Sequence, residues 1–544
     1  MRINKEHLIM SPPVFKMFVI FIIYLLANIT YLLNVDGVYW DDWVAFNQEY
    51  STLTLFYGQL QNTIHGYFSI VLLGIGNGVY GFRLALFVMY FISGLIIISI
   101  LKTLKLFEGH GAYLIGGFYL ISPIFHTKVA ISIIPFYFSV FIFFVAWYWL
   151  SRSIESFSWK SRVGILVLFF VSFTTSSLLV FYSFVLCYLF YKQNLENYKK
   201  ETSIFYKIEI FVRNNIEFIL LPIVFFIFKK NYLQPNGLYT GYNQVKFANV
   251  DLFLSNLVTS VDLVIWQPLE RAIISFWEIG LFVAVVICVI GLFSKAKGII
   301  TIKLESFTSA LVIFVIGLVG IWLAVFPYYM VGKIPISTGW DSRFQLLTVL
   351  PVALFLYGSI LICSICLSKL FSPLVRKDYT DLIFPSVLGF AMTILVSSSF
   401  YVQHRYNVDW FYQIGIEQKF IDSPTVKDNQ TFIVVNNVQP SLAYSREFNY
   451  YEWNGLLKQA YGDDSRLMIP PYYQDRLPAV AENQIHKQYN FSTWKLTTPI
   501  LVTIDYEARL DMLLIAKLYW YRIFDEKKFK YLAKKLVSVS YESI

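Results

Sequence analysis

Long runs of apolar residues recur through the chain up to Phe400, and each is about as long as a helix must be to cross a membrane. A helix of about 20 apolar residues spans the hydrocarbon core of a bilayer. Hydrophobic residues make up 57% of the chain and charged residues only 15%, whereas soluble domains have about 25% charged residues. The sequence therefore predicts a mainly α, polytopic membrane protein.

About eleven segments are expected to be transmembrane helices. The first, residues 13–34, is too long for the apolar core of a cleaved signal peptide. A polar cluster from Thr174 to Ser177 interrupts residues 163–191, which are longer than one span needs, so two spans are expected there. The other expected spans are residues 79–101, 111–125, 130–150, 216–228, 276–293, 307–326, 344–367 and 382–400.

The charges of the chain predict its orientation. The formal net charge is +9, and the tail from Tyr401 onward is nearly neutral, so the excess belongs to the membrane part. Most of its Lys and Arg residues fall in alternate loops, which the positive-inside rule assigns to the cytoplasm. We therefore expect a cell (inner) membrane protein with a cytoplasmic N-terminus. Nucleic-acid binding is not expected, since it needs a basic patch on a soluble module.

The tail differs from the rest of the chain in its pattern. It has short runs that predict strands at residues 431–435 and 500–504 and helices at residues 451–460 and 509–521. We therefore expect a membrane domain over residues 1–400 and a small α/β extracytoplasmic domain over residues 401–544. The tail contains none of the four cysteines, so disulfides do not stabilise it.

The loop expected outside the membrane at residues 35–78 carries an adjacent pair of carboxylates, Asp41 and Asp42, between Trp40 and Trp43. Tryptophan favours the membrane–water interface, so the two rings are expected to hold the carboxylates at headgroup depth. Carboxylates at that depth cost free energy, which favours a functional role. The alternative is that they cap the following helix, because Asp is a good N-cap residue.

Cationic residues on the same side are candidates for binding an anion. Arg343 directly precedes a span, and an arginine there can bind a lipid phosphate through two hydrogen bonds. Its alternatives are a headgroup anchor or an ion pair with Asp341. Arg83 lies inside a span, where we expect it to pair with Asp41 or Asp42. Lys333 and His65 are weaker candidates, since both residue types are common at interfaces.

The layout and the acidic pair resemble the GT-C-type glycosyltransferases, which use sugars linked to polyprenyl phosphate. The resemblance covers residues 13–400 in layout and rests on Asp41 and Asp42 as its specific motif. The nearest kind is the bacterial glucosyltransferases that decorate O-antigen and related cell-surface polysaccharides.

The resemblance implies that Asp41 or Asp42 is the general base, with a pKa raised by its neighbouring carboxylate. It also implies that Arg343, with Arg83 or Lys333, stabilises the leaving phosphate, and that Trp40, Trp43, His65 and Asp341 support the site or the acceptor. The acceptor would be a glycan or a lipid-linked molecule. No cofactor is expected, although a divalent cation is compatible with the family.

Two other functions remain open on the sequence. A surface-polysaccharide polymerase would use a pyrophosphate-linked donor and typically relies on arginines in outer loops, of which this chain has few. A transporter is the alternative that is not an enzyme. It would be expected to carry charged residues in the middle of its spans, whereas the charges here lie near the span ends.

Overall fold

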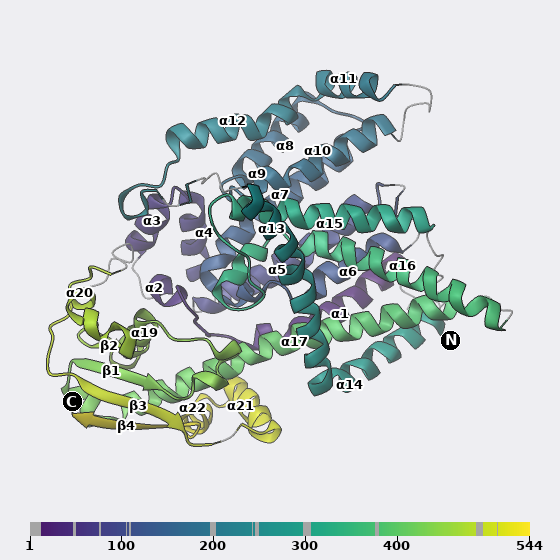
Figure 1. The fold of residues 1–544 in the computed structure, drawn as a ribbon. Coiled ribbons are helices and arrows are strands. Elements are labelled where there is room, and N and C mark those ends of the chain that lie inside the picture. Colours follow the sequence, from purple (N-terminus) through teal and green to yellow (C-terminus); the bar gives the residue numbers. More distant parts are fainter. Residues whose placement is uncertain are drawn as a thin grey trace, which may run out of the picture.

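The computed structural model describes residues 12–46, 50–75, 78–104, 106–107, 110–195, 203–241, 243–244, 250–296, 306–375, 380–485, 493–508 and 510–543. The chain is a mainly α, polytopic membrane protein, as the sequence predicts. Seven helices of the described part are long and apolar enough to cross a membrane, or up to eight if a bent pair is one span. Figure 1 shows these helices as a bundle with a sheet at one end.

The long helices of the bundle are α1 (Pro12–Leu33), α5 (Val79–Leu101), α7 (Ile134–Ser153), α14 (Gln267–Ala296), α15 (Phe307–Tyr329), α16 (Val349–Val375) and α17 (Thr380–Ile421). The bent pair is α11 (Ile204–Asn214) with α12 (Ile216–Tyr232), at an angle of 64°. The helix α13 (Val250–Val261) leads into α14.

Three segments in which the sequence predicts spans form shorter helices. They are α6 (Gly111–Ile121), α8 (Trp159–Ser172) and the pair α9 (Leu178–Phe181) and α10 (Ser183–Phe190). Helix α6 ends early because Ser122 is extended before Pro123, and a residue before proline disfavours helix. The chain breaks between α8 and α9 at the polar cluster, as expected.

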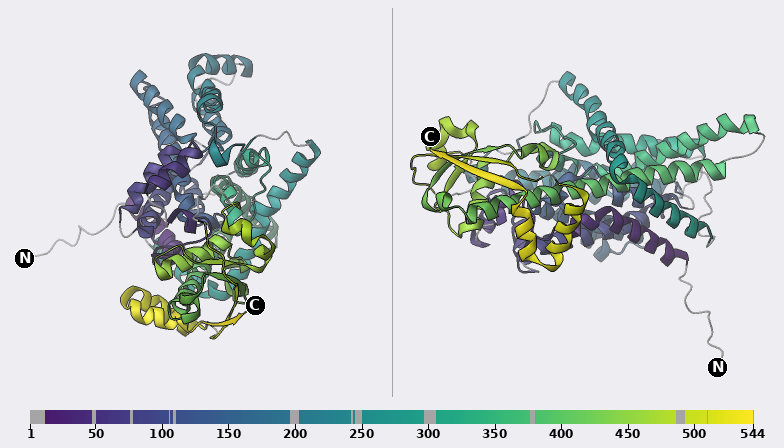
Figure 2. Two further views of the ribbon diagram at one scale, coloured as in Figure 1. Left: turned by 90° about the vertical axis from the view of Figure 1, so that its left-hand side faces the viewer. Right: turned by 90° about the horizontal axis from the view of Figure 1, so that it is seen from below.

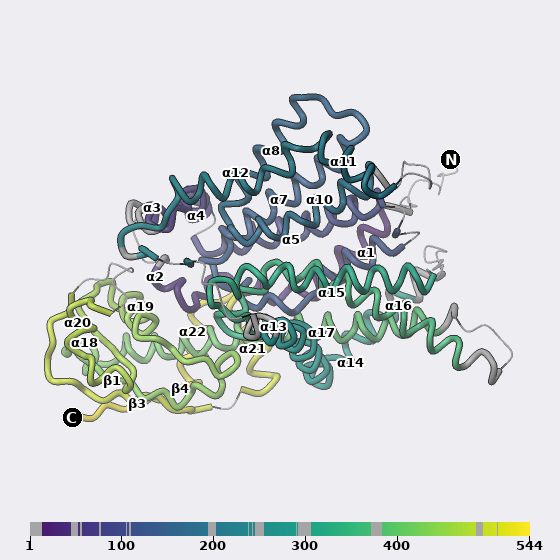
Figure 3. The backbone as a smooth tube through the Cα atoms, turned by 45° about the horizontal axis from the view of Figure 1, so that its top comes forward, coloured from purple at the N-terminus to yellow at the C-terminus, as the bar shows by residue number. Residues whose placement is uncertain are grey.

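The acidic pair and the C-terminal sheet lie at the same end of the bundle. Figures 2 and 3 show the sheet at the end opposite the start of α1, with α2 (Asp42–Phe46) beside α19 (Tyr450–Tyr461). The helices α3 (Tyr50–Gln59) and α4 (Thr63–Leu73) follow α2 at this end. The sequence predicts that the loop and the tail share one face of the membrane, and this arrangement agrees with it.

Helix α17 joins the bundle to the C-terminal sheet without a break. The domain boundary expected at residue 400 lies inside this helix, which continues to Ile421. At 42 residues α17 is about twice as long as a span requires. Its second half therefore forms a rigid connection between the two parts of the molecule.

The C-terminal α/β region, residues 424–543, contains a four-stranded sheet in the order β2-β1-β3-β4. The strands β1 (Thr431–Asn436), β2 (Leu467–Ile469) and β3 (Ile500–Tyr506) are parallel, and β4 (Val537–Ser543) is antiparallel to β3. Besides α19, the region contains α18 (Pro424–Asp428), α20 (Leu477–Ala481), α21 (Met512–Phe524) and α22 (Glu526–Lys534). The predicted strands and helices are present, and β2 and β4 are additional.

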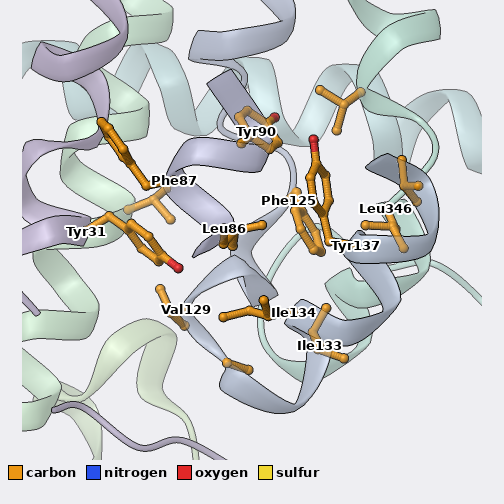
Figure 4. Packing of buried hydrophobic residues seen from close by; sticks show 14 of the residues in the cluster. Tyr31, Leu86, Phe87, Tyr90, Phe125, Val129, Ile133, Ile134, Tyr137 and Leu346 are labelled. Carbon is orange, nitrogen blue, oxygen red and sulfur yellow. The ribbon is translucent and has the colours of Figure 1, made fainter. Parts of the chain in front are cut away.

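A continuous apolar core lies beneath the acidic pair. Figure 4 shows Tyr31 of α1 and Leu86 of α5 packed near Val129 and Ile134, with Leu346 nearby. Val129 belongs to the short 3-10 helix η1 (His126–Val129), and Leu346 follows another, η6 (Trp340–Gln345). This core positions the segments that surround the carboxylates, because close packing of side chains holds helices together within a membrane.

Candidate active site

The acidic loop, residues 36–44, follows α1 and makes a tight turn. Backbone N–H groups of Asp42, Trp43 and Val44 donate to the carbonyl groups three residues earlier. Trp40 has a φ of 52°, which is a strained conformation for a bulky side chain. Such a conformation persists only where its surroundings impose it, so the contacts around this loop decide its shape.

The Asp42 carboxylate is completely buried and fully hydrogen-bonded. It accepts from the backbone N–H of Ile131 at 2.9 Å, from the N–H and hydroxyl of Ser132 at 2.9 and 2.7 Å, and from the N–H of Tyr39 at 3.3 Å. Burial raises the pKa of Asp42 to about 6, against the opposing effects of these hydrogen bonds and of Arg83. The cause is thus burial, whereas the sequence argument invoked the neighbouring carboxylate.

Asp41 points elsewhere and is only half-buried. Its Oδ1 accepts a hydrogen bond of 3.1 Å from the hydroxyl of Tyr451, which lies on α19. The C-terminal α/β region therefore contacts one of the two carboxylates directly. Of the acidic pair, Asp41 is the one with surface still accessible.

A buried ion-pair cluster made of Asp409, Arg446 and Glu452 holds the acidic loop. Arg446 donates to both oxygens of Asp409, at 2.7 and 3.1 Å, and to Glu452 at 2.6 Å. The same oxygen of Glu452 accepts the backbone N–H of Trp40 at 3.1 Å. The cluster links α17 and α19 to the strained residue of the loop.

The sequence analysis did not identify this cluster. One signal was present, because Asn449 and Glu452 form the N-x-x-E pattern of a capping box at the start of a predicted helix. Nothing in the sequence indicates that Arg446 would lie between two acids that are distant from each other along the chain.

The cationic segment, residues 333–345, lies against the acidic loop. Its Trp340 ring is 5.6 Å from the ring of Trp40. Arg343 lies over the rings of Trp340 and Phe344, at 4.3 and 4.8 Å, and Lys333 lies 5.4 Å from the ring of Phe344. The acidic loop and the cationic segment thus contact each other through a pair of tryptophans.

Arg343 also forms an ion pair with Asp341, at 3.2 Å. This is one of the alternatives that the sequence left open for Arg343. The pair is partly exposed, with 22% of the Arg343 side chain and 46% of the Asp341 side chain accessible. Exposed ion pairs contribute about 0–1 kcal/mol, so a stronger anion can displace Asp341 from Arg343.

Arg83 does not have the partner that the sequence predicts. It is fully buried and donates to the backbone carbonyls of Val129, at 3.0 Å, and Gly37, with its guanidinium over the ring of Tyr31. The expected hydrogen bond to Asp41 or Asp42 is replaced by these carbonyls. Its charge still favours the ionised form of Asp42, and it holds the start of the acidic loop in place.

His65 and Trp43 are both buried. His65 is hydrogen-bonded to the hydroxyl of Ser139 at 2.8 Å, which ties α4 to α7. Trp43 packs against Trp410 at 6.1 Å and against Gly455 of α19. A Cβ atom at Gly455 would lie 2.4 Å from the Trp43 ring, so glycine is required for this close approach.

Two further cations lie near this part of the molecule, one at the cationic segment and one at the polar cluster. Arg271 donates to the hydroxyl of Ser337, within the segment, and Lys229 donates to the hydroxyl of Ser176, in the polar cluster between α8 and α9. The neighbouring Ser177 accepts a hydrogen bond of 3.3 Å from Tyr328, whose ring packs on Phe344. The polar cluster that the sequence identified as a chain break thus lies near the cationic segment.

Among the residues that the structure describes, no group of three or more His, Cys, Asp or Glu side chains is arranged to hold a metal ion.

Comparison with known proteins gives structural neighbours only. No family model and no curated protein matches the sequence. The ArnT structure from Cupriavidus metallidurans, bound to undecaprenyl phosphate, is similar over 91% of this chain and 96% of its own, at 11% identity and a TM-score of 0.34.

A second similar structure is the oligosaccharyltransferase of Archaeoglobus fulgidus, tethered to an acceptor peptide. It covers 97% of this chain and 74% of its own, also at 11% identity and a TM-score of 0.34.

Proposed function

We propose that the protein is a membrane glycosyltransferase that moves a sugar from a polyprenyl-phosphate donor to a hydroxyl group of a surface glycan or a lipid-linked acceptor. Two observations together support the proposal. The acidic loop has one partly accessible carboxylate, Asp41, and the cationic segment with Arg343 contacts the same loop through Trp40 and Trp340. A base and an anion-binding group on one side of a membrane are what this reaction needs.

In the proposed reaction Asp41 is the general base. It takes the proton of the acceptor hydroxyl while that oxygen attacks the anomeric carbon of the sugar. The bond between the anomeric carbon and the phosphate oxygen breaks, and the lipid phosphate leaves with the bonding electrons. Arg343 and Lys333 bind the departing phosphate and stabilise the negative charge that it gains.

Asp42 and Arg83 have positioning roles in this proposal. Both are buried and have hydrogen-bonding partners within the chain, so neither is free to contact a substrate. Asp42 joins the acidic loop to the start of α7, and Arg83 holds Gly37. The catalytic role assigned to the acidic pair thus divides into a base, Asp41, and its support, Asp42.

The proposed side of the membrane is extracytoplasmic. The acidic loop and the C-terminal α/β region lie at one end of the bundle. The basic loops, such as the one after α5 with Lys102, follow the opposite ends of the helices. The positive-inside rule assigns these basic loops to the cytoplasm, which supports an inner-membrane enzyme that acts on cell-surface polysaccharides such as O-antigen.

The decisive experiment assays the purified protein and its Asp41→Asn variant against a panel of polyprenyl-phosphate sugars. Asn keeps the acceptor atom for Tyr451 but cannot take a proton, so transfer should fall about 100- to 10,000-fold while the thermal stability stays unchanged. Asp464→Asn, on an exposed turn of the α/β region, is the matched control and should transfer sugar normally. Full activity of the Asp41 variant would show that this carboxylate is not the base.

A surface-polysaccharide polymerase is the second candidate, and one observation favours it. Arg271 adds positive charge to the cationic segment through its contact with Ser337, which suits a pyrophosphate-linked donor. The same panel separates the two functions if it includes each sugar linked through one phosphate and through two. We expect transfer from the monophosphate donors, and exclusive use of pyrophosphate donors would favour the polymerase.

A further inference from the structure

Helix α21 presents an apolar face that the described part of the chain leaves exposed. Met512, Leu513, Trp520, Ile523 and Phe524 are 82%, 64%, 61%, 52% and 64% exposed. At 100° per residue these positions fall within one stripe of the helix. Apolar surface gathered on one face in this way marks a binding surface.

The opposite face of α21 is packed at the point where α1 leaves the membrane bundle. The Tyr519 hydroxyl accepts a hydrogen bond of 2.9 Å from Asn407 of α17, and Asn407 also donates to the carbonyl of Thr30, in the last turns of α1, at 2.7 Å. Arg522 forms an ion pair with Asp36, just beyond α1. Figure 2 shows α21 and α22 as a yellow pair that projects sideways from the sheet.

The depth of α21 in the bilayer can be inferred from α1, against which it packs. Residues Val14–Leu33 are a candidate span of 20 residues, which is about the length of the hydrocarbon core. Thr30 and Asp36 therefore lie close to the end of that core. A helix packed against both lies at the boundary between acyl chains and headgroups.

The charges of the helical pair α21–α22 fit a lipid surface. Residues 511–535 contain seven Lys or Arg and three Asp or Glu side chains. Lys517, Lys527, Lys528 and Lys535 are exposed. An amphipathic helix with Trp and Phe on one face and lysines beside it lies in the plane of the membrane interface, and anionic lipids attract it.

We infer that α21 is an interfacial membrane helix, whose face of Met512, Leu513, Trp520, Ile523 and Phe524 enters the lipid boundary beside the outer ends of α1 and α17. The occupant of this face is the bilayer that already surrounds the bundle, since the exposed apolar surface of α14, including Trp277 and Leu281, belongs to the same assembly of lipid-facing groups. The lipid contact anchors the C-terminal α/β region above the acidic loop. This inference is independent of the proposed function.

The test uses the full chain in nanodiscs of phosphatidylcholine and phosphatidylglycerol. Its four cysteines, Cys187, Cys288, Cys363 and Cys366, are replaced by alanine, and a single Leu513→Cys carries an environment-sensitive NBD fluorophore. Lipids with a doxyl group near the headgroup should quench this fluorophore, and aqueous iodide should not. The same label at Asp475→Cys, an exposed position of the α/β region away from α21, should respond to iodide only.

Two outcomes would overturn the inference. Quenching of the Leu513 label by iodide but not by doxyl lipid would place this face in water. Disulfide-linked dimers through unlabelled Leu513→Cys, without quenching of the labelled protein by lipid, would make the face a contact between two copies. Since Leu513 is exposed, the substitution leaves the core intact, and a labelled Trp520→Cys variant should reproduce the result.

Discussion

The acidic loop and the cationic segment contact each other, yet the structure holds them in different ways. The acidic loop is fixed by buried hydrogen bonds to Asp42 and by the Arg446 ion pairs that reach Trp40. The cationic segment is half-exposed and rests on aromatic faces, with one partly exposed ion pair between Asp341 and Arg343. A base must keep its position to within a fraction of an ångström, whereas groups that bind a long lipid phosphate must be able to adapt.

The glycines of the two segments show the same difference. A Cβ atom at Gly37, in the acidic loop, would lie 2.2 Å from Oδ1 of Asn34, so close packing requires glycine there. Gly332 directly precedes the cationic segment and Gly339 lies within it, and they have positive φ values of 74° and 68° and open space around their Cα atoms. Close packing requires glycine in one segment, and a left-handed backbone favours it in the other.

The largest expected effect comes from removing Arg446, the buried cation of the ion-pair cluster. Arg446→Met leaves Asp409 and Glu452 buried without a counter-charge, which costs about 3–5 kcal/mol of stability. It also releases the support of Trp40, so any transfer by the folded variant should fall by about 100-fold. Chemical denaturation in detergent and the transfer assay measure both effects.

Lys458→Met is the control for Arg446→Met. Lys458 pairs with Asp464 on the surface, and such pairs contribute about 0–1 kcal/mol. Equal stability of the two variants would mean that the ion-pair cluster does not hold the acidic loop.

The pH dependence of stability tests whether Asp42 helps to hold the acidic loop in its folded position. Its folded pKa of about 6 lies above the unfolded value of 3.8, so the folded state binds the proton more tightly. This contribution, about 3 kcal/mol, is fully present below the unfolded pKa and is lost as pH rises through the folded pKa. Denaturation of the wild type and Asp42→Asn between pH 4 and 8 should therefore show that the substitution costs most at low pH. A cost that is independent of pH would contradict the assignment.

Substitutions in the cationic segment should change the binding of the donor but not the stability of the protein. Arg343→Ala removes a charge-assisted contact to phosphate, worth about 1.5–3 kcal/mol, so the KM for donor should rise about 10- to 100-fold at unchanged thermal stability. Asp341→Asn releases Arg343 from its ion pair and should lower that KM. Unchanged donor affinity in both variants would return Arg343 to the role of a headgroup anchor.

Much of the fold was predictable, because apolar runs and short strands are local patterns. The long spans, the chain break after Ser172 and the strands β1 and β3 all correspond to predicted segments. The sequence predicted full spans where the short helices α6 and α8 lie, and it predicted no strand at β2. The lengths of these elements depend on tertiary packing. The same applies to α17, whose continuation past residue 400 depends on contacts with α19 and α22.

The sequence indicates which residues belong to the candidate site but not how they are arranged. Two adjacent aspartates at an interface can be identified from the sequence, but which of them is buried depends on the backbone N–H groups of Ile131 and Ser132. Likewise, a carboxylate partner for Arg83 was a reasonable expectation from charge alone. The chain satisfies that guanidinium with two carbonyls, and no sequence pattern indicates where free carbonyls will lie.

The smallest expected effect concerns the contact between the C-terminal α/β region and the base. Tyr451 donates its hydroxyl hydrogen to Asp41, and a hydrogen bond to a carboxylate helps to hold it in position. Tyr451→Phe should therefore leave Asp41 less well positioned and lower kcat/KM. At neutral pH the rate should fall only about 2- to 10-fold, as expected for one hydrogen bond of about 0.5–1.5 kcal/mol.

The neighbouring Tyr450 provides the matched control for this smallest effect. Its hydroxyl donates to the carbonyl of Ile485 at 3.1 Å, away from the acidic loop. Tyr450→Phe therefore loses a similar hydrogen bond of α19, and its kcat/KM should match the wild type. If both variants lower kcat/KM equally, the effect arises from α19 as a whole. A loss confined to Tyr451→Phe would make the α/β region a direct contributor to the chemistry, because the Tyr451 hydroxyl donates to the proposed base.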